Sequence, residues 1–120
     1  MGRTGVTSRQ QAKGDRAERE LAALLEELTG WRVSRKLGVG RSDDTGDLDG
    51  IPATVAQVKH YDDVLRAIRE VIADLPTQRA NAGVTHAVGF VRRRGGRWVA
   101  VMDLETWATW AREALNPPDS

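Results

Sequence analysis

The sequence predicts a single α/β domain in which a mixed sheet is flanked by helices, with the element order αβββαββα. Apolar residues recur at helical spacing in three stretches, and short alternating runs of strand-forming residues lie between them. The chain has 120 residues, of which 40% are hydrophobic and 29% are charged. This length supports one modest core and leaves no room for a second domain.

The first helix is predicted by an apolar stripe and by glycines near both ends. It begins near Gly14 and ends at Gly30, a typical C-terminal signal. The stripe consists of Ala17, Leu21, Leu24, Leu25 and Leu28. Residues 1–12 are polar and rich in Gly, Ser, Thr and Gln, so we expect a flexible N-terminal arm. The domain is then expected over residues 13–116, with residues 117–120 as a tail.

Two further helices follow from the same kind of pattern. Residues 62–75 carry apolar side chains at helical spacing. Pro76 is expected to interrupt this helix, because proline has no N–H to donate and its ring clashes with the preceding turn. A short helical piece is expected over residues 77–82. The last helix covers residues 104–115, with Asp103 as its N-cap.

Five strands are predicted between these helices. The first covers residues 31–36 and leads into a glycine-rich polar loop over residues 38–45. The next two form a β-hairpin with a tight turn at Pro52. The remaining two cover residues 84–91 and 98–102, joined by a turn rich in arginine and glycine.

The hairpin carries the most informative residues of the chain. It reads Gly46-Asp47-Leu48-Asp49-Gly50-Ile51-Pro52 and continues as Ala53-Thr54-Val55-Ala56-Gln57-Val58-Lys59. Because side chains alternate along a strand, Gln57 and Lys59 share one face, and Asp47 comes from the neighbouring strand. A carboxylate, a second oxygen ligand and an ammonium suit phosphodiester hydrolysis with Mg²⁺ or Mn²⁺. Asp49 shares a face with Asp47 and is the alternative ligand; Asp47 is favoured because it follows Gly46.

Composition narrows the kind of site. The chain has no cysteine, which excludes disulfides and Cys-type zinc sites, and its two histidines, His60 and His86, argue against a His-based zinc site. His86 lies in an apolar strand pattern and is expected to be a core histidine. No apolar run approaches the roughly 20 residues of a membrane span, and the N-terminus lacks a signal-peptide core. We therefore expect a cytoplasmic protein without a membrane partner.

Charge is segregated along the chain although the formal net charge is only +1. Residues 1–41 sum to +4, residues 42–63 to −5, residues 64–100 to +5 and residues 101–120 to −3. An acidic segment between two basic ones is typical of a polyanion-binding protein with a cation site, because phosphates need Lys and Arg whereas a metal needs carboxylates. Ordinary surface patchiness is the alternative.

Three motifs in this order carry a family resemblance. They are Lys13-Gly14-Asp15-Arg16-Ala17-Glu18 on the first helix, Gly46-Asp47 in the hairpin and Gln57-Val58-Lys59 on its second strand. Over about residues 13–105 the chain resembles the PD-(D/E)xK nucleases, and most of all the archaeal-type and phage Holliday-junction resolvases. The resemblance implies a restriction-endonuclease-like fold. It also implies a structure-selective DNA endonuclease, most of all a Holliday-junction resolvase.

The resemblance assigns roles to specific residues. It implies Glu18, Asp47, Gln57 and Lys59 as catalytic residues, and Glu18, Asp47, Gln57 and the Val58 carbonyl as ligands of Mg²⁺, for which Mn²⁺ can substitute. Lys59 would activate water for in-line attack, leaving 5′-phosphate and 3′-hydroxyl ends. The chain departs from the family at Gln57, where glutamate is usual. A glutamine carbonyl can still ligate Mg²⁺, but the site loses one negative charge.

DNA contacts are expected around this site. Basic residues flank the glycine-rich loop, and Gln78 with its neighbour matches a region in which the family often has a glutamine. The predicted DNA-binding residues are Lys13, Arg35, Lys36, Arg41, Ser42, Gln78 and Arg79. If the substrate is a four-way junction, symmetric cleavage of two strands implies a homodimer.

Several alternatives stay open. Gln57 also suits a catalytically inactive DNA-binding protein, a small protein-interaction or inhibitor domain is a third possibility, and other nucleases of this superfamily act on flaps, mismatches or specific sites. Asp15 and Glu18 also fit a helix capping box. Trp107 and Trp110 suggest core packing or a dimer contact. The arginine-rich turn over residues 92–97 either grips DNA or is a solvated turn.

Overall fold

The structure confirms the α/β class and the predicted order of elements. This computed structural model describes residues 2–36, 46–59, 63–93 and 95–116, with side chains from Asp15 onward. Its elements are α1 (Gly2–Thr29), β1 (Ser34–Arg35), β2 (Leu48–Asp49), β3 (Thr54–Lys59), α2 (Val64–Ala82), β4 (His86–Arg92), β5 (Trp98–Val101) and α3 (Leu104–Leu115).

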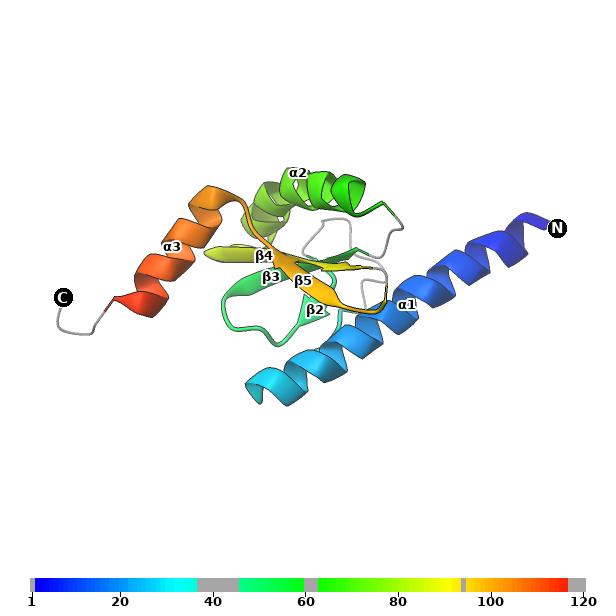
Figure 1. Cartoon of the computed structure of the whole chain (residues 1–120), viewed down its shortest axis with the longest axis horizontal. Helices are drawn as coiled ribbons and strands as arrows, with labels where there is room; N and C mark the ends of the chain where they lie inside the picture. Colours follow the sequence, from blue (N-terminus) through cyan, green and yellow to red (C-terminus); the bar gives the residue numbers. More distant parts are fainter. Residues whose placement is uncertain (1, 37–45, 60–62, 94, 117–120) are drawn as a thin grey trace.

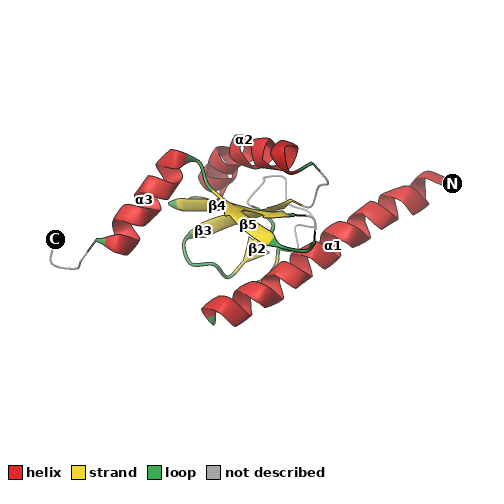
Figure 2. Ribbon diagram, viewed as in Figure 1, coloured by secondary structure: helices red, strands yellow, loops and turns green. Residues whose placement is uncertain are grey.

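The five strands form one mixed sheet in the order β1-β2-β3-β4-β5. Strands β3 and β4 are parallel and are connected by α2, whereas the other neighbouring pairs are antiparallel. The predicted hairpin is present, because Leu48 of β2 pairs with Ala56 of β3. Figures 1 and 2 show α2 on one face of the sheet and α1 on the other.

Alternation along the strands separates two apolar clusters, one on each face. Toward α2, Val55 of β3 packs with Ala67, Val71 and Leu75, and all four side chains are at most 2% exposed. Toward α1, the buried members are Leu21, Ala22, Val33, Leu48, Ala56 and Val88. The sheet therefore separates residues that project toward α2 from those that project toward α1.

Helix α2 packs very closely on β4. A Cβ atom placed on Gly89 would overlap the side chain of Val71, so only glycine fits at this point of the strand. Pro76 lies inside the helix rather than ending it, and the predicted interruption is wrong. Leu75 and Gln78, on either side of the proline, are each 1% exposed. We attribute the continuous helix to this burial, which offsets the cost of about 3 kcal/mol for an interior proline.

Helix α1 begins at Gly2, so the predicted start near Gly14 is wrong. The segment before Gly14 has no proline, and its Arg, Gln and Ala residues favour a helix. The predicted end is confirmed, because Gly30 adopts a φ of 78° and its N–H donates to the Glu26 carbonyl over 2.8 Å. Only part of the predicted stripe is buried: Leu21 is 2% exposed, whereas Leu28 is 79% exposed.

The other predicted boundaries differ by a few residues. The first strand is confined to Ser34–Arg35, and the fourth begins at His86 rather than at residue 84. Asp103 caps α3 as predicted, with its carboxylate accepting from the Thr106 N–H over 3.4 Å. In the described part of the chain, none of the helices combines the length and the apolar composition that a bilayer crossing requires.

Candidate active site

Gln57 and Lys59 share one face of β3, as their spacing predicts, and this face is turned toward α2. Gln57 Oε1 accepts a hydrogen bond from Gln78 Nε2, and Lys59 Nζ lies 3.8 Å from Glu70 Oε2. Both partners belong to α2. One face of β3 therefore presents an amide and an ammonium to the same helix, near the carboxyl end of the strand.

Asp47 lies directly beside these two residues. It precedes β2, and its carboxylate Oδ2 accepts the Val58 N–H over 2.8 Å. Its backbone is fixed on both sides, because its N–H donates to the Ala56 carbonyl over 2.7 Å and its carbonyl accepts the Lys36 N–H over 2.8 Å. The carboxylate is thus held at the level of Val58, between Gln57 and Lys59 along the chain.

Gly46 allows this close approach. Its φ is 93°, and a Cβ atom at this position would lie 2.9 Å from the Ala56 carbonyl oxygen, closer than real Cβ contacts. A larger residue would push the chain away from β3. By contrast Asp49, the alternative ligand, has a side chain that is 59% exposed and lies 3.4 Å from Lys36 Nζ. The geometry favours Asp47 over Asp49 as the carboxylate of the site.

The contact between Gln57 and Gln78 is buried. Gln57 is 8% exposed and Gln78 is 1% exposed. The prediction that Gln78 faces the site is therefore consistent with its position, although it contacts a protein side chain. Removing one partner of a buried hydrogen bond typically costs about 1–3 kcal/mol, because the other partner is left unsatisfied. The amide pair ties α2 to the strand that carries Lys59.

Glu70 is a carboxylate of the site that the sequence reasoning missed. It contacts Lys59 and also accepts from Arg66 Nε over 3.1 Å. Its position carried a usable signal, because it precedes Val71, a member of the buried face of α2. A residue at the border of that face can reach the neighbouring strand while it stays partly exposed.

Glu18 lies on the other side of the sheet. Its Oε2 accepts from Arg35 Nε over 3.0 Å, and Arg35 Nη2 lies 2.7 Å from Asp15 Oδ1. Arg35 pairs across strands with Leu48, which packs in the α1-side cluster, so these side chains project toward α1. The capping box is wrong, because α1 runs through Asp15. Arg35, a predicted phosphate contact, is engaged by two carboxylates.

The other predicted DNA-binding residues are dispersed. Lys36 Nζ lies 3.4 Å from Asp49, and Arg79 Nη1 donates to Thr106 Oγ1 of α3 over 3.3 Å. Lys36 is therefore adjacent to Asp47, whose carbonyl accepts its N–H, whereas Arg79 contacts the last helix. Arg41 and Ser42, with the predicted loop over residues 38–45, lie outside the described residues, as does the side chain of Lys13.

Three further predictions concern the far end of the sheet and the last helix. His86 is buried at 9% exposure, as expected of a core histidine, and its Nε2 lies 2.8 Å from Glu113 Oε2. Trp107 and Trp110 are 49% and 41% exposed, so the core-packing alternative is wrong for both. Arg92, the first residue of the predicted arginine-rich turn, is the last residue of β4, and its Nε lies 3.3 Å from Glu20 Oε2 on α1.

The comparisons with known proteins add no family. No family model, no curated protein and no solved structure matches the chain. The function is therefore inferred from the residues of the site.

The described residues offer a sparse cation site. Among them, no three His, Cys, Asp or Glu side chains come together, so Glu18, Asp47 and Glu70 do not form one cluster. The donors beside β3 are the Asp47 carboxylate and amide or carbonyl oxygens. Oxygen donors of this kind suit Mg²⁺, which keeps several waters and is held by one or two carboxylates in phosphate-processing sites. The donor set fits such an ion with few protein ligands.

Proposed function

We propose that this protein is a metal-dependent DNA endonuclease with a restriction-endonuclease-like fold. The Asp47 carboxylate, held 2.8 Å from the Val58 N–H and flanked by Gln57 and Lys59, is the observation that carries the proposal. A carboxylate from the residue before β2 and a lysine at the end of β3 can together hold an ion and stabilise charge on a phosphate. Because the chain resembles Holliday-junction resolvases, a four-way DNA junction is the first substrate to test.

In this proposal each residue of the site has a separate task. Asp47 holds the ion, with the Val58 carbonyl and the Gln57 side chain as the other expected protein ligands. When bound, the ion supplies positive charge for the phosphate and makes water more acidic. Glu18 lies on α1, on the opposite side of the sheet and paired with Arg35, so in this proposal it makes no direct contact with the ion.

Lys59 would orient the attacking water from its Nζ and stabilise the charge that develops on the phosphodiester. Its contact with Glu70 across 3.8 Å limits where the ammonium can lie. Glu70 is therefore a positioning residue in this scheme. The amide pair of Gln57 and Gln78 would act in the same way, since it fixes the distance between α2 and β3.

A specific observation favours a second candidate, a catalytically inactive protein that binds DNA. Gln57 Oε1, the atom expected to ligate the ion, accepts the hydrogen bond from Gln78. A buried amide pair is a stable structural element without any metal. In that case the fold and its charges would hold DNA, and no cation would be needed.

A cleavage assay distinguishes the two candidates. Four-way junction, nicked, flapped and linear duplex DNA are incubated with the protein in Mg²⁺, in Mn²⁺ and in a chelator. We expect metal-dependent cuts in the branched substrates, and paired symmetric cuts in the junction would identify a resolvase. DNA binding is measured in parallel as a function of salt, because phosphate contacts make affinity fall as salt rises.

Two asparagine variants serve as a matched pair. Asp47→Asn removes the charge but keeps an oxygen for the Val58 N–H, so the fold is preserved and cleavage is lost. Asp49→Asn makes the same change at an exposed neighbour and should cut normally. Equal cleavage by both variants would contradict the assignment of the site. Tight binding without cuts in any metal would establish the inactive DNA-binding protein, and salt-independent absence of binding would exclude both candidates.

A further inference from the structure

Strand β5 is the outermost strand at one side of the sheet. In the described part of the chain no strand pairs with its outer edge, and Figure 1 shows β5 in front of β4, with α2 above and α1 below. The strand reads Trp98-Val99-Ala100-Val101 and carries none of the prolines or charges that protect edge strands. The opposite edge is β1, which is only two residues long. The two edges are therefore not equally protected.

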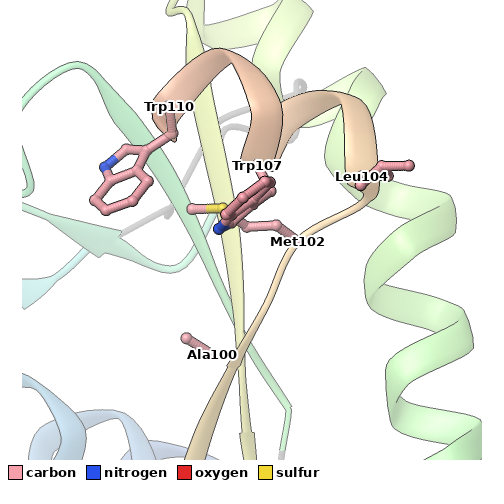
Figure 3. A pocket seen from close by; sticks show the side chains of 5 residues that line it. All are labelled: Ala100, Met102, Leu104, Trp107 and Trp110. Carbon is pink, nitrogen blue, oxygen red and sulfur yellow. The ribbon is translucent and has the colours of Figure 1, made fainter. Parts of the chain in front are cut away.

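Apolar side chains flank β5 on the α1 side. A hollow of about 590 Å³ is lined by Ala100, Met102, Leu104, Trp107 and Trp110. A second hollow, of about 420 Å³, lies between β5 and the C-terminal half of α1 and also includes Ala100. Figure 3 shows the Trp107 ring beside Met102, and Ala100 apart from both indole rings on β5.

The exposed apolar residues concentrate at this place. Eight large hydrophobic side chains are exposed among the described residues, and five of them line the two hollows. These five are Leu24, Leu28, Leu104, Trp107 and Trp110. Single exposed hydrophobic residues need no explanation, but a contiguous patch marks an interaction site. An edge strand with apolar flanks suits a protein partner that can pair with backbone groups.

We propose that a second copy of this chain docks here, with β5 antiparallel to β5 of that copy. The charges at the two ends of the strand select this occupant. Arg93 and Arg97 precede β5, and Asp103 and Glu105 follow it. A two-fold axis through Ala100 brings Arg97 opposite Asp103 of the second copy, because the two residues lie three positions to either side of Ala100. At each end of the paired β5 strands, an arginine of one copy then lies opposite an aspartate of the other.

This dimer constrains the arrangement of the two candidate active sites. A two-fold axis between antiparallel edge strands reverses the direction of every strand in the second copy. The joined sheet has ten strands, and β3 of one copy runs in the opposite direction to β3 of the other. The two Lys59 residues, each at the carboxyl end of its β3, therefore lie toward opposite sides of the dimer. Such a dimer would make independent cuts and would not by itself explain paired cuts in one junction. The interface does not depend on the proposed nuclease function.

Sedimentation equilibrium of the full chain tests the dimer. Concentrations from about 1 to 100 μM cover the range of a modest homodimer. We expect a monomer–dimer equilibrium for the wild type and a monomer for Ala100→Glu, which places two like charges beside the axis. Ala73→Glu makes the same change at an exposed alanine of α2 and should associate like the wild type.

A second matched pair keeps the test decisive if Ala100→Glu fails to fold. Leu104 is 78% exposed in the first hollow, and Leu65 is 72% exposed on α2. Leu104→Lys should weaken association by about tenfold or more, as truncation of an interface anchor does, and Leu65→Lys should have no effect. A wild type that stays monomeric at every concentration would overturn the proposal. So would dimerisation of both Ala100→Glu and Leu104→Lys at wild-type strength.

Discussion

The two faces of the sheet are covered to different degrees. On the α2 side, Ala67, Val71 and Val91 are fully buried, and Gly89 makes room for the helix. On the α1 side, Leu21 is buried but Leu28 on the same helix is 79% exposed. We call the α2 side the closed face and the α1 side the open face. The closed face also holds Gln57 and Lys59 against α2, whereas the open face presents the two apolar hollows.

The difference in packing suits the two faces to different functions, catalysis and association with a partner. Chemistry needs side chains held within fractions of an ångström, and a tightly packed helix provides that support. An exposed apolar surface lowers solubility unless a partner covers it. The closed face is therefore the place for the candidate active site, and the open face is the place for association.

The largest effect is expected at Lys59. Lys59→Ala should reduce cleavage by about 10²–10⁴-fold, as loss of a catalytic proton-transfer or charge-stabilising group does, while DNA affinity is kept. Single-turnover cleavage and a binding titration measure the two quantities. Arg112→Ala, which removes an exposed cation from α3, is the control and should retain cleavage. Undiminished cutting by Lys59→Ala would contradict the site.

A smaller effect is expected at Gly89, where the closed face is tightest. Gly89→Ala should lower the free energy of unfolding by about 1–3 kcal/mol, because the added methyl group overpacks against Val71. Urea denaturation measures the change. Val71→Ala in the same chain should recover part of it, and Ala100→Leu, which adds volume on the open face, should change it little. If Gly89→Ala were as stable as the wild type, the closed face would not be tightly packed.

The smallest effect is expected on the open part of α1. Leu28→Ala should change the free energy of unfolding by less than about 0.5 kcal/mol, because exposed substitutions rarely do more. Leu21→Ala, in the same apolar stripe but 2% exposed, should cost about 2–5 kcal/mol. Thermal or urea unfolding, at a concentration low enough to keep both variants monomeric, gives the comparison. Equal costs would mean that Leu28 is buried in solution.

Much of the fold could be predicted from local signals. Apolar stripes, the glycine at position 30 and the Asp103 cap identified the helices, and alternation identified β3 with Gln57 and Lys59 on one face. The error at Pro76 arose because packing overrides local preference. Pro76 stays inside α2 because the residues around it are buried.

The candidate site was less predictable than the fold, because its contacts join distant segments. Asp47 and Val58 are neighbours in one hairpin, so their approach follows from local pairing. The contacts of Gln57 with Gln78 and of Lys59 with Glu70 depend on how α2 packs on β3. Arg35 was mispredicted for the same reason. It was expected to contact a phosphate, but it lies between Asp15 and Glu18 of α1, which are distant in the sequence.

Calorimetric titration of Mn²⁺ into the wild type, Asp47→Asn and Gln57→Glu tests the central claim most directly, because it needs no DNA substrate. Gln57→Glu places a carboxylate next to Gln78 and should tighten binding by about tenfold or more, the scale on which changes around metal ligands alter affinity. Asp47→Asn should abolish binding, and the wild type should lie between the two. Equal affinity in all three proteins, or no binding in any of them, would contradict a metal site at Asp47 and Gln57.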